Sequence, residues 1–200
     1  MTLSSRARRI VCQASFLAMA CFSLAQPTLA QDAPRVKFVT NAGEFVVEVY
    51  PDKAPKTVDN FLQYVRDKHY DGTIFHRVIA NFMVQGGGYD QRYMERSTRA
   101  PVMHEGLEAI SKGGPRNTVG TIAMARTSAP HSATAQFFIN VVDNAFLDPT
   151  PAQPGYTVFG KVVSGMEVVN RIRNTPTGSG GRFGSDVPRN PIVIQSASML

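Results

Sequence analysis

The sequence predicts an all-β domain, a closed barrel of eight strands with two helices. The chain has 200 residues, which suits one domain with a sizeable core after an N-terminal leader is set aside. Eight runs are rich in β-branched and aromatic residues, and only two stretches carry apolar residues at helical spacing. Eight short strands with two helices favour a barrel that closes on itself.

Residues 1–30 have the features of a secretory signal peptide. Three arginines lie within residues 6–9, and an apolar run over residues 10–24 follows them. The run is shorter than the roughly 20 apolar residues that a membrane-spanning helix needs. Small residues then precede a suitable cleavage point, so we expect cleavage after Ala30, with Ala25 as the second choice.

Two other interpretations of the leader stay open. Cys21 follows small residues and could carry a lipid, although the usual leucine three residues before it is missing. Arg8 and Arg9 could form a twin-arginine export signal, but their surroundings fit that pattern poorly. We therefore predict a signal peptide over residues 1–30 and one domain over residues 31–200.

Removal of the leader changes the composition in two ways. Cys12 and Cys21 are the only cysteines, so the mature chain would fold in an oxidising compartment by core burial alone, without a disulfide. Three arginines and no acids leave with the leader, which lowers the net charge from +6 to +3. The remaining charge is dispersed and includes no basic run, which argues against nucleic acid as a partner.

The mature chain opens with a hairpin. Val36, Phe38 and Thr40 alternate with polar neighbours, and a second β-rich run follows the turn residues 41–43. Six further β-rich runs bring the count to eight strands. They cover Ile74–Val78, Phe82–Gln85, Thr118–Ala125, Gln136–Val142, Tyr156–Val163 and Ile192–Ser196. The segments 86–115 and 174–191 are rich in Gly, Pro, Arg and Ser, and we expect both to be loops.

The two helices are expected between these strands. After Thr57, apolar residues recur at helical spacing from residue 58 to residue 65, which predicts a helix that ends near His69. Ser164 and Glu167 have the spacing of a capping box, in which each side chain bonds the backbone N–H of the other residue. They predict the start of a second helix, which runs to about Arg173.

The segment FHRVIANFMVQGGG, residues 75–88, combines a histidine, an arginine and a glutamine but contains no acid, serine or cysteine. A serine near residues 128–132 could serve His76 as a nucleophile, although no spacing supports this. The four histidines are scattered, so we expect no metal site, and the glycines lack the Lys-Ser/Thr that follows a phosphate-binding loop. No cofactor is indicated.

Several spaced motifs resemble the cyclophilins, a family of peptidyl-prolyl cis-trans isomerases. They are FHRVIANFMVQGG, IAMARTSAPHSATAQFFINV, NAFLD and GYTVFGKVVSGMEVV, in that order, and the match covers residues 35–197. The sequences of these motifs are similar to those of the bacterial branch of the family. The resemblance implies an eight-stranded closed antiparallel β-barrel capped by two α-helices, which agrees with the elements read from the residues.

The resemblance also implies a reaction that needs neither acid nor nucleophile. Rotation about an Xaa-Pro bond breaks no bond and only loses amide resonance, so preferential binding of the twisted amide accelerates it. The proline nitrogen regains a lone pair at mid-rotation, and the arginine of the FHR motif, here Arg77, would stabilise it. Without the motif, we would interpret Arg77 as an ordinary solvent-exposed charge.

The other site residues follow from matching motif positions. Phe82, Met83, Phe138 and Leu147 should seat the proline ring, and His76 should support them by packing and hydrogen bonding. Gln85 and Gln136 should hold the arginine and the substrate carbonyl. Period-two alternation sends Phe75 and Phe137 to the opposite face, into the core. The remaining groove residues are Ala125, Arg126, Phe146 and Tyr156.

Three positions depart from the better-known eukaryotic pattern. Phe146 stands where many cyclophilins have a tryptophan, Tyr156 where a histidine is common, and Arg126 where an asparagine lies in the groove. The segment from Met124 to Gln136 is one residue longer, which leaves the correspondence of residues 127–135 open. Proline binding should survive, but we expect weak cyclosporin binding because the indole N–H donor is missing.

The predicted function is an active isomerase that assists the folding of exported proteins in the periplasm. The alternative is a proline-peptide binding module or chaperone without activity, which could lose the arginine and keep the pocket. Arg77, Gln85 and Phe138 are all present, which favours the enzyme. The expected partners are proline-containing peptides and folding exported proteins, and we expect a monomer that does not stay on the membrane after the leader is removed.

Overall fold

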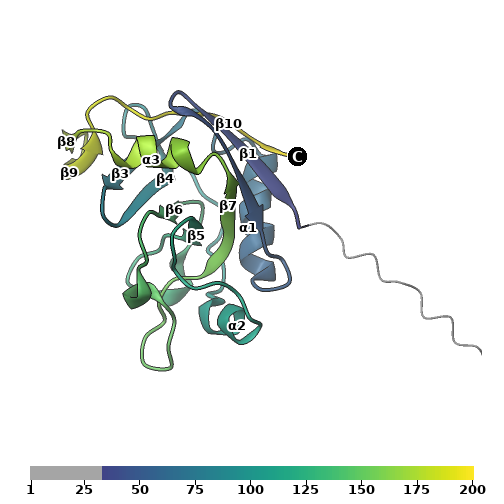
Figure 1. Ribbon diagram of the computed structural model, residues 1–200. Helices are drawn as coiled ribbons and strands as arrows, with labels where there is room; N and C mark the ends of the chain where they lie inside the picture. Colours follow the sequence, from purple (N-terminus) through teal and green to yellow (C-terminus); the bar gives the residue numbers. More distant parts are fainter. Residues whose placement is uncertain (1–32) are drawn as a thin grey trace, which may run out of the picture. The chain divides into compact units, whose positions relative to one another are not determined.

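The computed structural model describes residues 33–200, which form the domain drawn in colour in Figure 1. The predicted signal peptide, residues 1–30, lies outside the described residues, and so do residues 31 and 32 at the start of the predicted mature chain. Within residues 33–200, no helix combines the length and the apolar character needed to cross a membrane.

Eight antiparallel strands form one sheet that curves into a nearly closed barrel, in the order β10-β1-β2-β7-β5-β6-β4-β3. The strands are β1 (Arg35–Thr40), β2 (Gly43–Val49), β3 (Thr73–Ile79), β4 (Met83–Asp90), β5 (Thr121–Met124), β6 (Phe137–Asn140), β7 (Val158–Ser164) and β10 (Ile194–Met199). Backbone bonds at the starts of the two end strands, β3 and β10, bring the ends of the sheet together: Phe75 N–H donates to the Ile192 carbonyl at 2.9 Å, and Gly72 N–H donates to the Ile194 carbonyl at 2.7 Å. The predicted eight-stranded barrel is confirmed.

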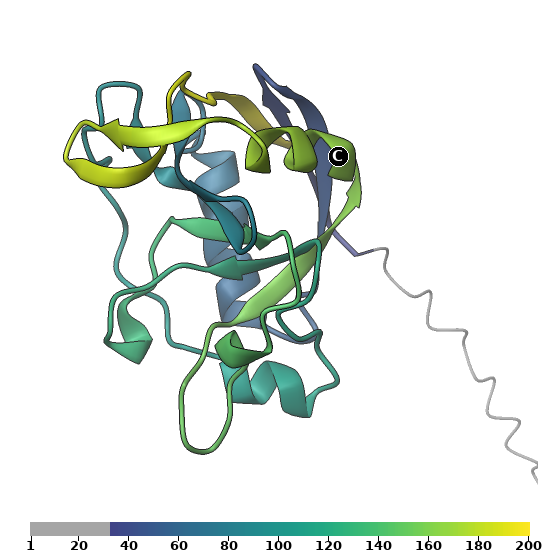
Figure 2. The ribbon, with the colours of Figure 1, turned by 60° about the vertical axis from the view of Figure 1, so that its left-hand side comes forward.

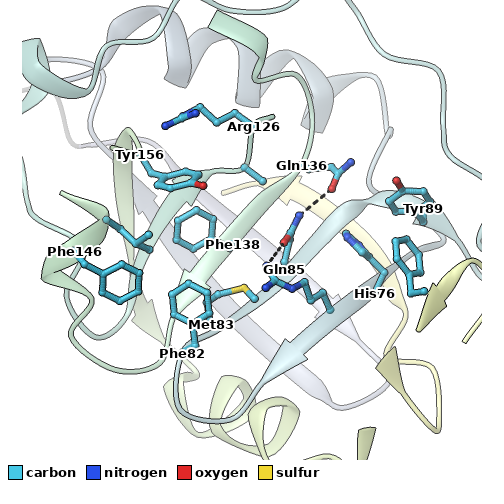
Figure 3. Close-up of a pocket in the computed structure, with 14 residues that line it drawn as sticks. His76, Phe82, Met83, Gln85, Tyr89, Arg126, Gln136, Phe138, Phe146 and Tyr156 are labelled. Atoms are coloured by element: carbon cyan, nitrogen blue, oxygen red, sulfur yellow. Dashed lines mark hydrogen bonds between the residues drawn. The ribbon is translucent and has the colours of Figure 1, made fainter. Parts of the chain in front are cut away.

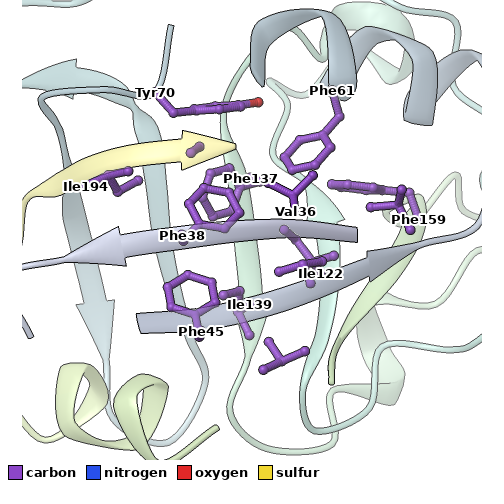
Figure 4. Close-up of a cluster of buried hydrophobic side chains, with 14 of the residues drawn as sticks. Val36, Phe38, Phe45, Phe61, Tyr70, Ile122, Phe137, Ile139, Phe159 and Ile194 are labelled. Carbon is purple, nitrogen blue, oxygen red and sulfur yellow. The ribbon is translucent and has the colours of Figure 1, made fainter. Parts of the chain in front are cut away.

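The main core fills the barrel, and strand alternation builds it. In β1 the residues Val36, Phe38 and Thr40 are buried while their neighbours are not, as the sequence pattern predicts. Aromatic rings occupy the centre (Figure 4), where the rings of Phe38 and Phe45 stack at 5.0 Å. Phe75 and Phe137 are fully buried in the same cluster, so the predicted alternation is correct for both.

Two of the helices pack against the barrel close to where the sequence predicts them. Helix α1 (Pro55–Arg66) buries its apolar stripe in the core but ends at Arg66, a turn before the predicted His69. Helix α3 (Met166–Arg173) buries Val168, Val169 and Ile172.

The predicted capping box of α3 is wrong. Gly165 is the N-cap, with φ of +79°, and no side chain caps the helix. A Cβ at Gly165 would overlap the backbone of β2 at Phe45, so a close approach of chains decides this helix start. Ser164 and Glu167 are both exposed and do not form the reciprocal bonds.

The two segments expected to be loops contain regular structure. Within residues 86–115, β4 continues to Asp90 and a short helix, α2 (Gly106–Ser111), follows. Within residues 174–191, a separate hairpin forms from β8 (Thr177–Gly180) and β9 (Phe183–Pro188), and β9 packs along β3 (Figure 2). Two single-turn 3₁₀ helices complete the described elements, η1 (Pro130–Ser132) and η2 (Ala145–Leu147).

Candidate active site

The residues predicted from the sequence to form the site lie together on the outer wall of the barrel. All twelve line one pocket of about 540 Å³, and Tyr89 and Phe183 complete its lining (Figure 3). The twelve are His76, Arg77, Phe82, Met83, Gln85, Ala125, Arg126, Gln136, Phe138, Phe146, Leu147 and Tyr156. A pocket of this size suits a short peptide segment around one residue.

Strand pairing brings the polar groups of the pocket into one row. Arg77 on β3 lies opposite Gln85 on β4, and Gln85 lies opposite Phe138 on β6. Arg77 Nη1 donates to Gln85 Oε1 at 3.5 Å, and Gln85 Nε2 donates to Gln136 Oε1 at 3.1 Å (Figure 3). The arginine itself is exposed, so its guanidinium faces the open side of the pocket while Gln85 holds it from below.

An apolar floor lies beside this row and is separate from the main core. Its buried members include Met83, Phe138 and Leu147, and the partly buried Phe82 and Tyr156 pack against them. The floor forms because alternate residues of β4 and β6 face outward while Val84 and Ile139 fill the barrel. A proline ring, which is apolar and has no N–H to satisfy, would fit such a floor.

Phe146 forms the outer edge of the pocket. It comes from η2, its side chain is 65% exposed, and its ring stacks on that of Phe82 at 5.6 Å. The Arg77 guanidinium carbon lies 6.0 Å from the centre of the Phe82 ring, on the limit of a cation–π contact. The edge of the pocket is therefore a pair of aromatic rings beside the Arg77 guanidinium.

Arg126 forms the opposite wall, where it joins two loops. Its guanidinium carbon lies 4.6 Å from the centre of the Tyr156 ring. Nε and Nη2 both donate to the Gly155 carbonyl, at 3.0 and 2.7 Å, and Nη1 donates to the Thr127 carbonyl at 2.8 Å. The Tyr156 ring in turn meets Phe138 edge-on at 5.4 Å. Arg126 lines the groove as predicted, but most of its donors are occupied by the protein.

Buried amides fix the apolar floor from behind. Asn144 Nδ2 donates to the Phe82 carbonyl at 2.9 Å, and Asn117 Nδ2 donates to the Leu147 carbonyl at 3.2 Å. Asn140 joins the two, since it accepts from Asn144 at 2.7 Å and donates to Asn117 at 3.2 Å. A satisfied buried network of this kind permits few alternative arrangements.

His76 is buried and neutral. Its side chain is 3% exposed, and its ring packs on Tyr89 with the centroids 4.7 Å apart. Burial, with a smaller effect of the Arg77 charge, lowers the pKa of His76 from 6.5 to about 4. We expected packing and hydrogen bonding from His76; the ring provides the packing, whereas its buried Nδ1 has no hydrogen-bond partner.

Within residues 33–200 no group of three or more His, Cys, Asp or Glu side chains is placed to hold a metal ion.

Two residues that line the pocket were not predicted from the sequence. Tyr89 follows the glycines of β4 and is 9% exposed, and Phe183 belongs to a segment that we expected to be a loop. Composition gave no signal for Phe183, because only the pairing of β8 with β9 brings it beside β3.

Comparison with known proteins identifies the family of this chain. Residues 35–199 match the family model for cyclophilin type peptidyl-prolyl cis-trans isomerases. The peptidyl-prolyl cis-trans isomerase cyp18 of Streptomyces antibioticus is 54% identical over 168 residues, which is 82% of this chain and 98% of the relative. Peptidyl-prolyl cis-trans isomerase B of Escherichia coli is 48% identical over 167 residues, with the same shares.

A solved structure shows the same fold. It is a cyclophilin type isomerase of Cryptosporidium parvum, determined in the presence of the dipeptide Ala-Pro. It is 25% identical to this chain, with a TM-score of 0.66 over 83% of this chain and 98% of that one. Because the family match spans nearly the whole described domain, the chain belongs to the cyclophilin family of peptidyl-prolyl cis-trans isomerases.

Proposed function

We propose that this isomerase acts by placing the Arg77 guanidinium beside the nitrogen of a proline seated on the apolar floor. The observation that carries the proposal is the row Arg77–Gln85–Gln136 at the edge of that floor. No acid, serine or cysteine lines the pocket, so proton transfer by a carboxyl group and covalent catalysis lack a side chain. A fixed cation remains as the means of catalysis.

The chemistry follows from what changes during rotation. The barrier is about 20 kcal/mol because amide resonance is lost when the bond twists. At mid-rotation the nitrogen becomes pyramidal and carries a lone pair, which a guanidinium N–H can approach. To shorten the step from tens of seconds to about a millisecond, the site needs roughly 6 kcal/mol of preference for the twisted amide. The hydrogen bond that Arg77 donates to Gln85 orients the guanidinium before the substrate arrives, so little reorganisation remains at the transition state.

The substrate class is a peptide with an accessible Xaa-Pro bond. The proline ring would lie between Met83, Phe138 and Leu147, with Phe82 and Phe146 beside it. The relative from Cryptosporidium parvum was crystallised with Ala-Pro, a dipeptide that ends in proline, which supports this assignment. Gln136 is half-buried in the lining of the pocket, where its amide would meet a substrate carbonyl.

The natural clients would be exported proteins. The leader over residues 1–30 has the charge and the apolar run of a signal peptide, which supports a mature isomerase that works on exported proteins in the periplasm. The reaction needs no ATP or cofactor, which suits a compartment without them. A domain of this size with a single core can work there as a monomer without a disulfide.

The test compares Arg77→Ala with Arg66→Ala in a protease-coupled or NMR-exchange assay on a short Xaa-Pro peptide. Arg66 is an exposed arginine on α1, outside the pocket, so its loss removes the same charge elsewhere. We expect Arg77→Ala to lower kcat/KM by about 10²–10³, as for other single electrostatic donors. Wild-type activity in Arg77→Ala would contradict the proposal, and an inactive wild type that still binds the peptide would favour a binding module.

A further inference from the structure

The β8–β9 hairpin supplies one wall of the pocket from a distant part of the chain. It is a two-stranded sheet outside the barrel, and β9 packs along β3, which carries His76 and Arg77. Phe183 is the first residue of β9, and its half-buried ring lines the pocket. Figure 2 shows the hairpin reaching out from one side of the barrel beside β3. The hairpin therefore packs against β3 and also contributes the Phe183 side chain to the site.

The ring of Phe183 packs into an aromatic cluster around His76. Its centroid lies 5.3 Å from that of His76 and 5.0 Å from that of Tyr89, and His76 and Tyr89 are 4.7 Å apart. Tyr93 extends the cluster, with its ring 6.4 Å from Phe183. Edge-to-face and tilted pairs at these distances contribute beyond simple burial. Because His76 Nδ1 has no hydrogen-bond partner, packing by Tyr89 and Phe183 is what holds that side of the ring.

His76 occupies a bulge that decides where Arg77 points. Phe75 pairs with Gly86 and Arg77 pairs with Gln85, so His76 is an extra residue on β3. Phe75 and Val78 both face the main core, whereas His76 and Arg77 both line the pocket. Simple alternation after Phe75 would send Arg77 into the barrel. The bulge is therefore the feature that brings the guanidinium to the outside, beside Gln85.

We propose that Phe183 is a positioning residue for isomerisation, which covers the His76 ring, holds the β3 bulge in place and so directs Arg77 into the pocket. The inference rests on the proposed role of Arg77, and it adds that a residue more than a hundred positions away sets the geometry of that arginine. Without the Phe183 ring, His76 keeps one aromatic neighbour and gains access to water. The bulge then loses the contact between Phe183 and His76, so the orientation of the Arg77 side chain is less well fixed.

The same change would alter the titration of His76. The titratable or charged groups around the ring are Arg77 on β3 and Tyr89 on β4, and the exposed Arg182 precedes Phe183 in the hairpin turn. Burial is the main reason why the pKa of His76 is about 4. Loss of the covering ring would raise that pKa toward 6.5 and place an imidazolium next to the Arg77 guanidinium at mildly acid pH.

The experiment measures kcat and KM separately for Phe183→Ala, Phe183→Leu and the control Ser185→Ala, and follows the His76 ring protons by NMR during a pH titration. Ser185 lies on the same strand and is exposed, outside the pocket. We expect Phe183→Ala to lower kcat about 10-fold or more, since misplacement of a catalytic group by about 1 Å is costly, and to move the His76 titration toward pH 6. Phe183→Leu, which still covers the ring, should recover most of the activity, and Ser185→Ala should match the wild type.

The outcomes separate this inference from the role of Arg77. Phe183 lies outside the main core, so thermal unfolding should show that the barrel persists in Phe183→Ala. A Phe183→Ala variant with wild-type kcat and an unchanged His76 titration would overturn the inference while leaving Arg77 catalysis intact. A change in KM alone would also overturn it, because that result would mean that Phe183 only contacts the peptide. If Arg77→Ala were fully active, the proposed function itself would fail first.

Discussion

Gly88→Ala should damage catalysis without damaging the fold. Gly88 has no positive φ, so alanine fits its backbone. A Cβ there would overlap Cγ of Gln136 and lie only 2.5 Å from its Cδ and 2.7 Å from its Nε2, against the 3.4–4 Å of an ordinary contact. The whole Gln136 side chain must therefore move by about 1 Å, which a change of rotamer allows. The barrel strands themselves need not move.

The displaced amide belongs to the row that holds Arg77. Loss of the 3.1 Å bond between Gln85 and Gln136 should cost about 1 kcal/mol of transition-state stabilisation, which is about a 5-fold drop in kcat/KM. If Gln85 also releases Arg77, the cost doubles and the drop approaches about 30-fold. We expect the free energy of unfolding to change by less than about 1 kcal/mol.

The assay is NMR exchange on an Xaa-Pro peptide together with thermal unfolding, and Gly178→Ala is the matched control. A Cβ at Gly178 would meet only Arg189, at 3.7 Å or more, which is an ordinary contact and involves no residue of the row. The reasoning is refuted if Gly88→Ala keeps wild-type kcat/KM. It is equally refuted if the variant loses activity only in proportion to a lowered unfolding temperature, since the effect would then be on folding.

Three further predictions concern the drug pocket, stability and export. Phe146→Trp should strengthen cyclosporin inhibition by restoring an indole N–H, and tight inhibition of the unmodified protein would contradict this. Because the pKa of His76 is lower in the folded state than the usual 6.5, its contribution of about 3 kcal/mol to stability is present above pH 6.5 and is lost as the pH falls toward 4. Denaturant titrations of the wild type and His76→Gln across that range should therefore differ in slope with pH, and parallel curves would argue against a buried neutral His76. Mass spectrometry of the exported chain should find an N-terminus at Gln31, whereas a lipid-modified Cys21 would refute the cleavage prediction.

Sequence reasoning succeeded where local pattern and tertiary role coincide. The first hairpin and α1 have apolar residues at the spacing of their elements, and the structure buries those residues. It failed where a contact between distant segments decides the outcome. Gly165 starts α3 because β2 lies against it, and nothing in the four residues of the expected capping box carries that information.

The site shows the same division. Motif positions gave the twelve residues that line the pocket, but the sequence could not explain why both His76 and Arg77 face it. Period-two alternation places one of them inside the barrel, and only the bulge on β3, which depends on pairing with β4, places both outside. Phe183 was missed for a related reason, since glycines and a serine around it suggested a loop rather than a hairpin that docks on β3.

The most direct test of Arg77 catalysis is the pH profile of kcat/KM from about pH 5.5 to 8.5, measured for the wild type, Arg77→Lys and His76→Gln. An arginine stays charged throughout, and His76, with a pKa of about 4, stays neutral, so the wild-type profile should be flat. Arg77→Lys should be poor at every pH because an ammonium cannot reproduce the planar fork that Gln85 orients, while His76→Gln should lose much less. A profile that follows one ionisation near 6.5 and loses it in His76→Gln would contradict the account, because a proton would then move in the rate-limiting step.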